Sequence, residues 1–233
     1  MTTFVLVHGA WSGAHGFRKI RPLLREAGHE VYTPSLTGIG ERSHLASPQV
    51  NLTTHIHDVV NTILYEDLEN IVLLGFSYGG MVVTGALPHI HERVSHLVYL
   101  DAFVPDGGDS AHGLRGSASD QISLGQEWYM NPLDRKFDNP ADTDWYGARR
   151  SAQPKATFLQ KLDVPLKPEQ YHFSLDYIKA AADESEGRDS AFWRAAAIAR
   201  DSEHWGYHEI NTNHMIAINR PRELADVLLG ISG

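Results

Sequence analysis

Short apolar runs alternate along the chain with stretches in which apolar side chains recur every three or four positions. Residues 4–7 and 30–33 are predicted strands, and residues 16–27 between them have helical spacing and end at Gly28, a typical helix C-cap. The same alternation continues to about residue 100. Strands that alternate with helices in this way favour a parallel sheet with helices on both faces.

The later elements follow from the same pattern. A helix is expected from Thr53 or Thr54 to about Leu68, and a strand over residues 71–74 precedes a helix that ends near Ile90. The remaining expected elements are strands at 94–100, 175–180 and 206–210 and helices through 193–199 and 222–229. The chain therefore predicts one α/β domain over residues 1–233.

The alternation stops between residue 106 and about residue 173. This stretch contains prolines, aromatic residues and three probable short helices, and no strand is expected in it. An insertion of this length between two sheet strands is typical of a cap. We therefore expect a helical cap over the strand ends, inserted after the strand that ends at Asp101.

Composition narrows the classes of function. The 233 residues are 42% hydrophobic, and no run approaches the about 20 apolar residues of a membrane span. Residues 1–7 are expected to form the first strand and not a signal peptide. The absence of cysteine excludes disulfides, thiolate metal sites and a cysteine nucleophile, and it agrees with a cytoplasmic location. A net charge of −9 makes nucleic acid a poor partner, because phosphate binding requires a basic surface.

The sequence Gly75-Phe76-Ser77-Tyr78-Gly79 fits a nucleophile elbow. It follows an apolar strand and precedes a helix rich in small residues, which is the context that Gly-x-Ser-x-Gly requires. The glycines leave room for a sharp turn that carries the serine hydroxyl out of the sheet, toward a helix N-terminus that stabilises negative charge. Ser77 is therefore the candidate nucleophile.

A serine nucleophile needs a base and an acid that orients the base. Among 14 histidines, His214 follows the last predicted strand and so lies at the same sheet edge as Ser77. Asp183, just beyond the strand at 175–180, is the preferred acid. Rival carboxylates are Glu184, Glu186 and Asp101, and for Asp101 a structural role in capping backbone N–H groups is preferred.

Metal and phosphate sites are not expected. The pairs His55/His57 and His89/His91 lie two residues apart on predicted helices, where side chains point about 200° apart. His204 and His208 are four residues apart, but residues 205–210 are predicted to form a strand, where this spacing does not place two side chains together as it does on a helix. No Gly-Lys-Ser/Thr follows the glycines of the elbow.

Taken together, these pieces resemble an α/β-hydrolase of the short methylesterase and hydroxynitrile-lyase-like group. The matching stretches are residues 4–11, 75–80, 97–105, 177–183, 214–215 and 220–225, in the order Ser, Asp, His of that fold. The resemblance implies Ser77 as nucleophile, His214 as base and Asp183 as its orienter. It also implies an oxyanion hole from the backbone N–H groups of Ala10 and Tyr78.

The expected activity is hydrolysis of a small or medium carboxylic ester through an acyl-enzyme, without a cofactor or metal. Hydroxynitrile-lyase-type or cofactor-free oxygenase chemistry at the same site remains open, as does a slow-turnover receptor for a small ligand. The expected partner is the ester substrate, with a homodimer left open. Aromatic residues expected near the substrate are Trp11, Trp128, Tyr129 and Trp145. The resemblance implies that the plant lyases have a threonine at the position of Gly9. The hydroxyl of that threonine is absent from this chain.

Overall fold

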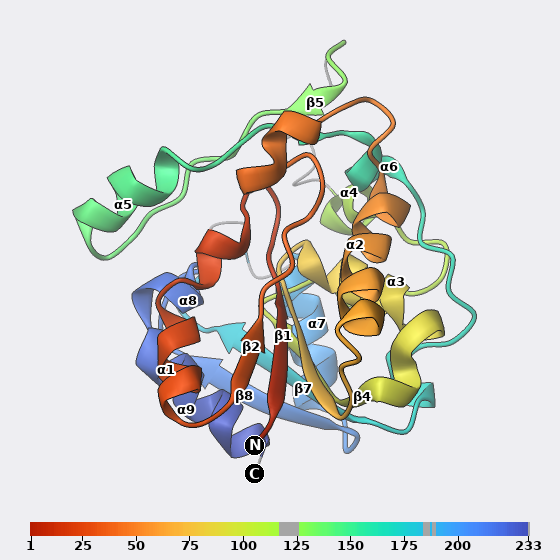
Figure 1. The fold of residues 1–233 in the computed structure, drawn as a ribbon, viewed down its shortest axis with the longest axis vertical. Helices are drawn as coiled ribbons and strands as arrows, with labels where there is room; N and C mark the ends of the chain where they lie inside the picture. Colours follow the sequence, from red (N-terminus) through yellow and green to blue (C-terminus); the bar gives the residue numbers. More distant parts are fainter. Residues whose placement is uncertain (117–125, 184–186, 188–189, 233) are drawn as a thin grey trace.

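A six-stranded parallel sheet forms the centre of the molecule. The computed structural model describes residues 1–116, 126–183, 187 and 190–232. Strand order across the sheet is β2-β1-β3-β4-β7-β8, and every neighbouring pair is parallel (Figure 1). The strands are β1 (Thr3–Val7), β2 (Glu30–Tyr32), β3 (Ile71–Phe76), β4 (Val94–Leu100), β7 (Ser174–Ala180) and β8 (Trp205–Ile210).

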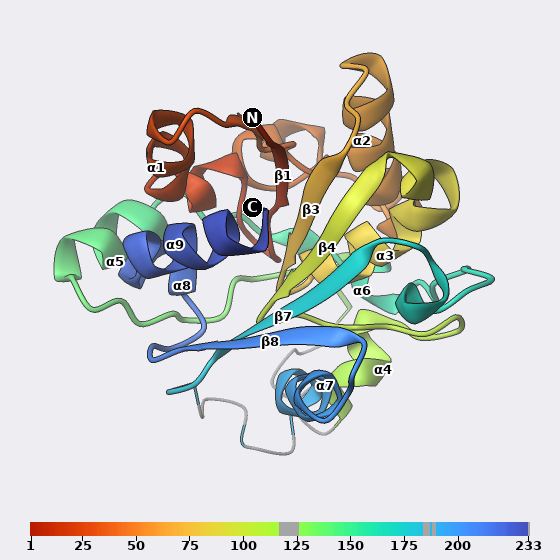
Figure 2. The ribbon, with the colours of Figure 1, turned by 90° about the horizontal axis from the view of Figure 1, so that it is seen from below.

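Helices cover both faces of this sheet. Figure 2, which views the sheet from below, shows α1, α8 and α9 on one face and α2, α3 and α7 on the other. The helices are α1 (Ile20–Glu26), α2 (Leu52–Tyr65), α3 (Gly79–Ile90), α4 (Ala111–Arg115), α5 (Pro140–Gly147), α6 (Ala156–Leu159), α7 (Ala191–Arg200), α8 (Ile216–Asn219) and α9 (Pro221–Ile231). The expected layered α/β architecture is confirmed.

Alternating side chains of the buried strands divide the core into two apolar clusters. Leu73 of β3 belongs to the cluster that also contains residues of α2, α3 and α7, whereas Leu74 points to the opposite face and belongs to the cluster that contains residues of α1 and α9. β3 is buried at all six positions, as expected for a central strand covered on both faces. This rigid strand leads directly into Ser77.

Helix α2 differs from its expected bounds at both ends. Its N-cap is Asn51, whose side chain accepts the Thr54 N–H at 3.1 Å while the Thr54 hydroxyl accepts the Asn51 N–H at 3.3 Å. The helix ends at Tyr65 and not near Leu68. The threonine is thus the partner of the capping residue in a reciprocal capping box.

The segment at 106–173 contains strands that the sequence did not predict. β5 (Tyr129–Met130) and β6 (Gln153–Pro154) form a short antiparallel pair, so the expectation of a purely helical insertion is wrong. Two-residue strands carry no readable alternation, because their pairing is decided by tertiary contacts. One such contact is the Trp11 backbone N–H, which donates to Gln153 Oε1 at 2.8 Å. In Figure 1, α5, β5 and α6 lie toward one end of the sheet.

Candidate active site

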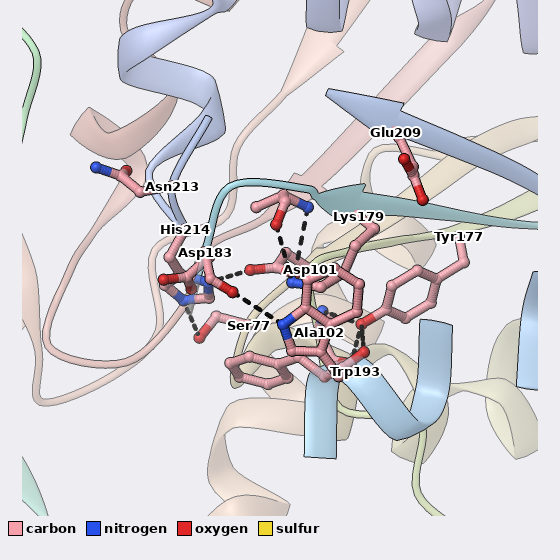
Figure 3. Close-up of polar contacts among 12 residues, drawn as sticks. Ser77, Asp101, Ala102, Tyr177, Lys179, Asp183, Trp193, Glu209, Asn213 and His214 are labelled. Carbon is pink, nitrogen blue, oxygen red and sulfur yellow. Dashed lines mark hydrogen bonds and ion pairs between the residues drawn. The ribbon is translucent and has the colours of Figure 1, made fainter. Parts of the chain in front are cut away.

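The polar residues of the site follow the carboxyl ends of neighbouring strands. Ser77 follows β3, Asp101 follows β4, Asp183 follows β7 and His214 follows β8. Since all the strands run parallel, their carboxyl ends meet at one edge of the sheet. Figure 3 shows these four side chains gathered at that edge.

Ser77 occupies a sharp, strained turn. Its φ is 57°, in the left-handed region that a serine rarely adopts. A Cβ on Gly75 would lie 2.8 Å from the carbonyl oxygen of Gly79, and a Cβ on Gly79 would lie 2.7 Å from that of Val7. Only glycine fits at both positions. The turn is held by the Ser77 N–H, which donates to the Leu100 carbonyl at 3.2 Å, and α3 begins two residues later.

A continuous chain of hydrogen bonds joins the serine to a histidine and a carboxylate. His214 Nε2 lies 2.9 Å from Ser77 Oγ, and His214 Nδ1 lies 2.6 Å from Asp101 Oδ2 (Figure 3). A carboxylate can only accept, so Nδ1 carries the hydrogen and Nε2 is left to accept from the serine hydroxyl. This is the arrangement in which an imidazole can take the proton of a serine.

Asp101 is fully buried and has a second cationic partner. Lys179 Nζ lies 2.6 Å from Asp101 Oδ1, and the two side chains are 1% and 0% exposed. The register Leu100↔Ile178 places these two residues side by side on neighbouring strands. Burial alone would raise the pKa of Asp101, but the hydrogen bond and charge of His214, together with the charge of Lys179, outweigh it and hold this pKa below its usual value. The carboxylate is therefore ionised at neutral pH.

The structure places Asp183 beside the histidine but does not join it to Nδ1. The nearest ligand atoms of Asp101, Asp183 and His214 lie within 4.8 Å of one another, and among the described residues this is the one cluster with a cation-binding spacing. The Asp183 carbonyl accepts from Trp193 Nε1 at 2.8 Å. The carboxylate bonded to His214 Nδ1 is thus that of Asp101 and not that of Asp183, which corrects the position expected from sequence. The rivals Glu184 and Glu186 lie outside the described residues.

The reason for this difference is the distance of each carboxylate from its strand. Asp101 follows β4 directly, and its φ of 42° lies in the left-handed region. Asp183 stands three residues beyond the end of β7, where the chain has begun to leave the sheet. The expected role of Asp101 in capping backbone N–H groups is limited to one long hydrogen bond, in which the Ala180 N–H donates to Asp101 Oδ1 at 3.4 Å.

Two aromatic rings fix the orientation of the His214 imidazole. Phe192 stacks on it with ring centroids 5.1 Å apart and planes at 7°, and Phe76 approaches at 4.7 Å and 33°. His214 is buried, so its ring has little freedom to rotate away from Ser77. The aromatic contacts and the Asp101 hydrogen bond constrain the same two torsions.

Two other buried histidines near the site have structural roles. His8 Nδ1 bonds to the Gly9 carbonyl at 2.9 Å, and its Nε2 accepts from the Leu36 N–H at 3.1 Å. His55 bridges the Thr37 carbonyl and the Tyr78 hydroxyl. Burial lowers the pKa of each to about 4, so both rings are neutral at pH 7. Neither ring is hydrogen-bonded to Ser77.

Two backbone N–H groups beside Ser77 are available to a ligand. Ala10 follows the end of β1, and Tyr78 is the N-cap of α3. Among the described residues, no acceptor takes either N–H group. The side chain of Tyr78 points away from this position, stacked on Phe158 at 5.2 Å. The two groups fit the donors of an oxyanion hole.

The hollow at Ser77 has walls from both the sheet edge and the segment at 106–173. Its lining residues are Ala10, Trp11, Phe76, Ser77, Arg135, Tyr146, Arg150, His214 and Met215. Of the four aromatic residues expected near the substrate, Trp11 lines this hollow and Trp128, Tyr129 and Trp145 do not. The Trp145 ring packs against Arg18 and Arg149, at 4.0 and 4.1 Å from the two guanidinium carbons. The sequence analysis missed Arg135, Tyr146, Arg150 and Lys179.

Comparison with known proteins identifies the family. The sequence profile of the alpha/beta hydrolase family matches residues 4–227, so the chain belongs to this family and is a hydrolase enzyme. The expected kinship with methylesterases and hydroxynitrile lyases is also confirmed.

Individual relatives agree with this assignment. The chain is 52% identical to a carbendazim hydrolyzing esterase of Nocardioides sp. (strain SG-4G) over 114 residues, which are 49% of this chain and 47% of that protein. The match thus spans about half of that relative. Polyneuridine aldehyde esterase of Rauvolfia serpentina is 27% identical over 256 residues, covering 98% of this chain and 95% of the relative. An α-hydroxynitrile lyase of Arabidopsis thaliana is 24% identical, with coverages of 98% and 96%.

A solved structure has the same fold. An extracellular α/β-hydrolase from a Paenibacillus species superposes with a TM-score of 0.85 at 23% identity, covering 99% of this chain and 98% of that one. This match supports the architecture of the whole described chain. None of the helices in the described ranges has both the length and the apolar character needed to cross a bilayer.

Proposed function

We propose that this protein is a serine carboxylic-ester hydrolase that acts on a small or medium ester through an acyl-enzyme. The observation that carries the proposal is the hydrogen-bond chain from Ser77 through His214 to Asp101, with distances of 2.9 and 2.6 Å. Relatives named as esterases, and a solved methylesterase with the same fold, support the same reaction class.

Each half of the proposed reaction has two proton transfers through one imidazole. Ser77 Oγ attacks the ester carbonyl while His214 Nε2 takes its proton, and the Asp101 carboxylate stabilises the resulting imidazolium. The N–H groups of Ala10 and Tyr78 donate to the oxyanion of the tetrahedral intermediate. His214 then protonates the departing alcohol. Water then attacks the acyl-enzyme while His214 Nε2 takes its proton, and His214 returns that proton to Ser77 Oγ as the bond from Oγ to the acyl carbon breaks and the acid is released.

The segment at 106–173 is proposed to act as a cap that shapes the substrate site. The support is that Arg135, Tyr146 and Arg150, all from this segment, line the hollow that contains Ser77. A cytoplasmic location also belongs to the proposal, and cell fractionation tests it. A homodimer is tested by light scattering on the purified protein.

Turnover of a panel of short alkyl and aryl esters, with Ser77→Ala as the control, tests the proposed activity. We expect turnover within the ordinary enzymatic range of about 1 to 1,000 per second on the best ester. Intact-mass analysis with a fluorophosphonate should show one adduct on the native chain and none on Ser77→Ala. Single turnovers with tight product binding would favour the receptor alternative, and an unlabelled Ser77 would contradict the mechanism.

A second candidate reaction is cyanohydrin cleavage, which the Arabidopsis relative performs according to its name. A Cβ on Gly9 would lie 2.9 Å from Ser77 Cβ, so a threonine hydroxyl cannot be added there without displacing the nucleophile. This contact favours ester hydrolysis.

A further inference from the structure

Two arginines face the reaction site from the segment at 106–173. Arg135 and Arg150 line the hollow that holds Ser77, and no carboxylate is among the residues lining that hollow. A chain with a formal charge of −9 thus presents two cations and no anion at the point where its substrate must bind. Neither arginine belongs to the hydrogen-bond chain of Ser77, His214 and Asp101.

The surroundings of Arg150 leave part of its guanidinium without an acceptor. Its Nη1 donates to the Leu133 carbonyl, and its guanidinium carbon lies 5.9 Å from the centre of the Trp11 ring. Its Nε is buried and, in the described part of the chain, has no hydrogen-bond partner. A ligand oxygen that accepts from this buried donor would remove the cost of leaving it without an acceptor.

Arg135 adds a second charge close enough to be felt by the first. Burial, with a smaller contribution from the positive charge of Arg135, lowers the pKa of Arg150 to about 10, while Tyr146 and Asp134 act in the opposite direction. Within the described ranges, Arg135 makes no ion pair. Two like charges at one hollow favour the binding of an anion between them.

We propose that the natural substrate is an ester that carries a carboxylate a few atoms from its scissile carbonyl, and that Arg135 and Arg150 bind that carboxylate. This proposal rests on the esterase activity proposed above. A guanidinium matches a carboxylate with two parallel N–H···O bonds, so both the charge and the shape of the group would be recognised.

The position of the two side chains sets the reach of the substrate. A neighbouring hollow of about 350 Å³ shares Arg135, His214 and Met215 with the one at Ser77, but it is also lined by Asp134 and Asp183. Its mixed charge makes it a poor site for an anion. We therefore assign the carboxylate to the hollow at Ser77, close to the reacting carbonyl. Half-esters of short dicarboxylic acids and esters of short hydroxy acids have a carboxylate at this distance from the ester.

Two matched pairs of esters test the proposal. Monomethyl succinate is compared with methyl succinamate, and acetoxyacetate with acetoxyacetamide, because each pair differs only by a carboxylate against an isosteric amide. The ratio of kcat/KM for the charged to the neutral ester is measured for the native chain, Arg135→Gln, Arg150→Gln and Arg150→Lys. Arg222→Gln, an exposed arginine of α9, is the matched control for a change in net charge.

We expect the native ratio to be at least about tenfold in favour of the charged ester for one of the two pairs, as one good charge-assisted contact provides. Arg135→Gln and Arg150→Gln should bring the ratio toward one through KM, Arg150→Lys should retain part of it, and Arg222→Gln should leave it unchanged. Circular dichroism checks the fold of each variant.

A native ratio near one for both pairs would overturn the proposal. So would equal losses on charged and neutral esters, because the arginines would then act on the oxyanion or on packing. A different result would contradict the esterase activity itself: neither the charged nor the neutral esters would be hydrolysed, and Ser77 would not be labelled.

Discussion

Asp101→Asn removes the anion on which both His214 and Lys179 depend, and its effects on rate and on stability can be separated. With an amide at this position, His214 Nδ1 no longer faces a pure acceptor at 2.6 Å, so the tautomer that leaves Nε2 free is no longer enforced. In a related triad this exchange lowers kcat about ten-thousand-fold, equivalent to about 5 kcal/mol. We expect a loss of this order, with KM little changed.

The same substitution also destabilises the fold. Lys179 is 1% exposed and would lose its charged partner at 2.6 Å. Removing one member of a buried ion pair costs about 3–5 kcal/mol, because the other charge stays buried without compensation. Asp101→Asn should therefore unfold at a clearly lower urea concentration than the native chain. Adding Lys179→Met should recover most of this stability, since no uncompensated charge remains, without recovering kcat.

Single-turnover and steady-state ester hydrolysis give the kinetic terms, and urea unfolding gives the free energies for a double-mutant cycle. Asp183→Asn is the matched control, because it makes the same chemical change on a partly exposed carboxylate next to the same histidine. A thousandfold loss in Asp183→Asn, with Asp101→Asn within tenfold of native, would refute the assignment of the acid.

Three other outcomes are expected. Ser77→Ala should abolish ester turnover with less than about 1 kcal/mol change in the free energy of unfolding, because the alanine loses only a hydroxyl at a hollow; surviving turnover in the purified variant would dismiss this nucleophile. Ester hydrolysis should exceed cyanide release from mandelonitrile, and the reverse order would establish lyase chemistry. The free energy of unfolding should fall as pH drops from about 6.5 to about 4, because His8 and His55 bind protons in the unfolded chain but stay neutral while buried in the folded one. His55→Gln should make this dependence on pH weaker. An unchanged slope in urea titrations would show that His55 does not titrate in this way.

Local patterns were sufficient for the sheet and for two of the site residues. Apolar runs end at Phe76, Leu100, Ala180 and Ile210, and the parallel arrangement brings whatever follows them to one edge. Ser77 and His214 were predictable because the glycine-flanked turn and the last strand each point to a single residue. The pair of β5 and β6 was not predictable, because two residues carry no periodicity.

Lys179 was a signal in the sequence for the position of a buried anion, and the choice of Asp183 did not take it into account. Lysine is almost never fully buried unless it is paired, and this one stands in a buried strand whose other polar residues are Ser174 and Asp176. The sheet order places β4 beside β7, so a buried lysine at the end of β7 requires an anion at the end of β4. That anion is Asp101. The requirement becomes visible only once the strand order is known.

Charge balance explains why two carboxylates stand near one histidine. Lys179 compensates much of the charge of Asp101, so the ion pair holds the imidazole in place but contributes less field to stabilise the imidazolium than an unpaired carboxylate would. A carboxylate oxygen of Asp183 lies within 4.8 Å of a ring nitrogen of His214 and adds a negative charge there. His214 Nδ1 is bonded to Asp101 and not to Asp183, so Asp183 does not orient the ring. If Asp101 orients the imidazole and Asp183 adds to the electric field at it, the two substitutions should differ in their effect on kcat. Asp183→Asn should then lower kcat only a few-fold, as a partly exposed charge at about 5 Å contributes about 1 kcal/mol, and the loss should diminish in 1 M salt, whereas the loss in Asp101→Asn should not.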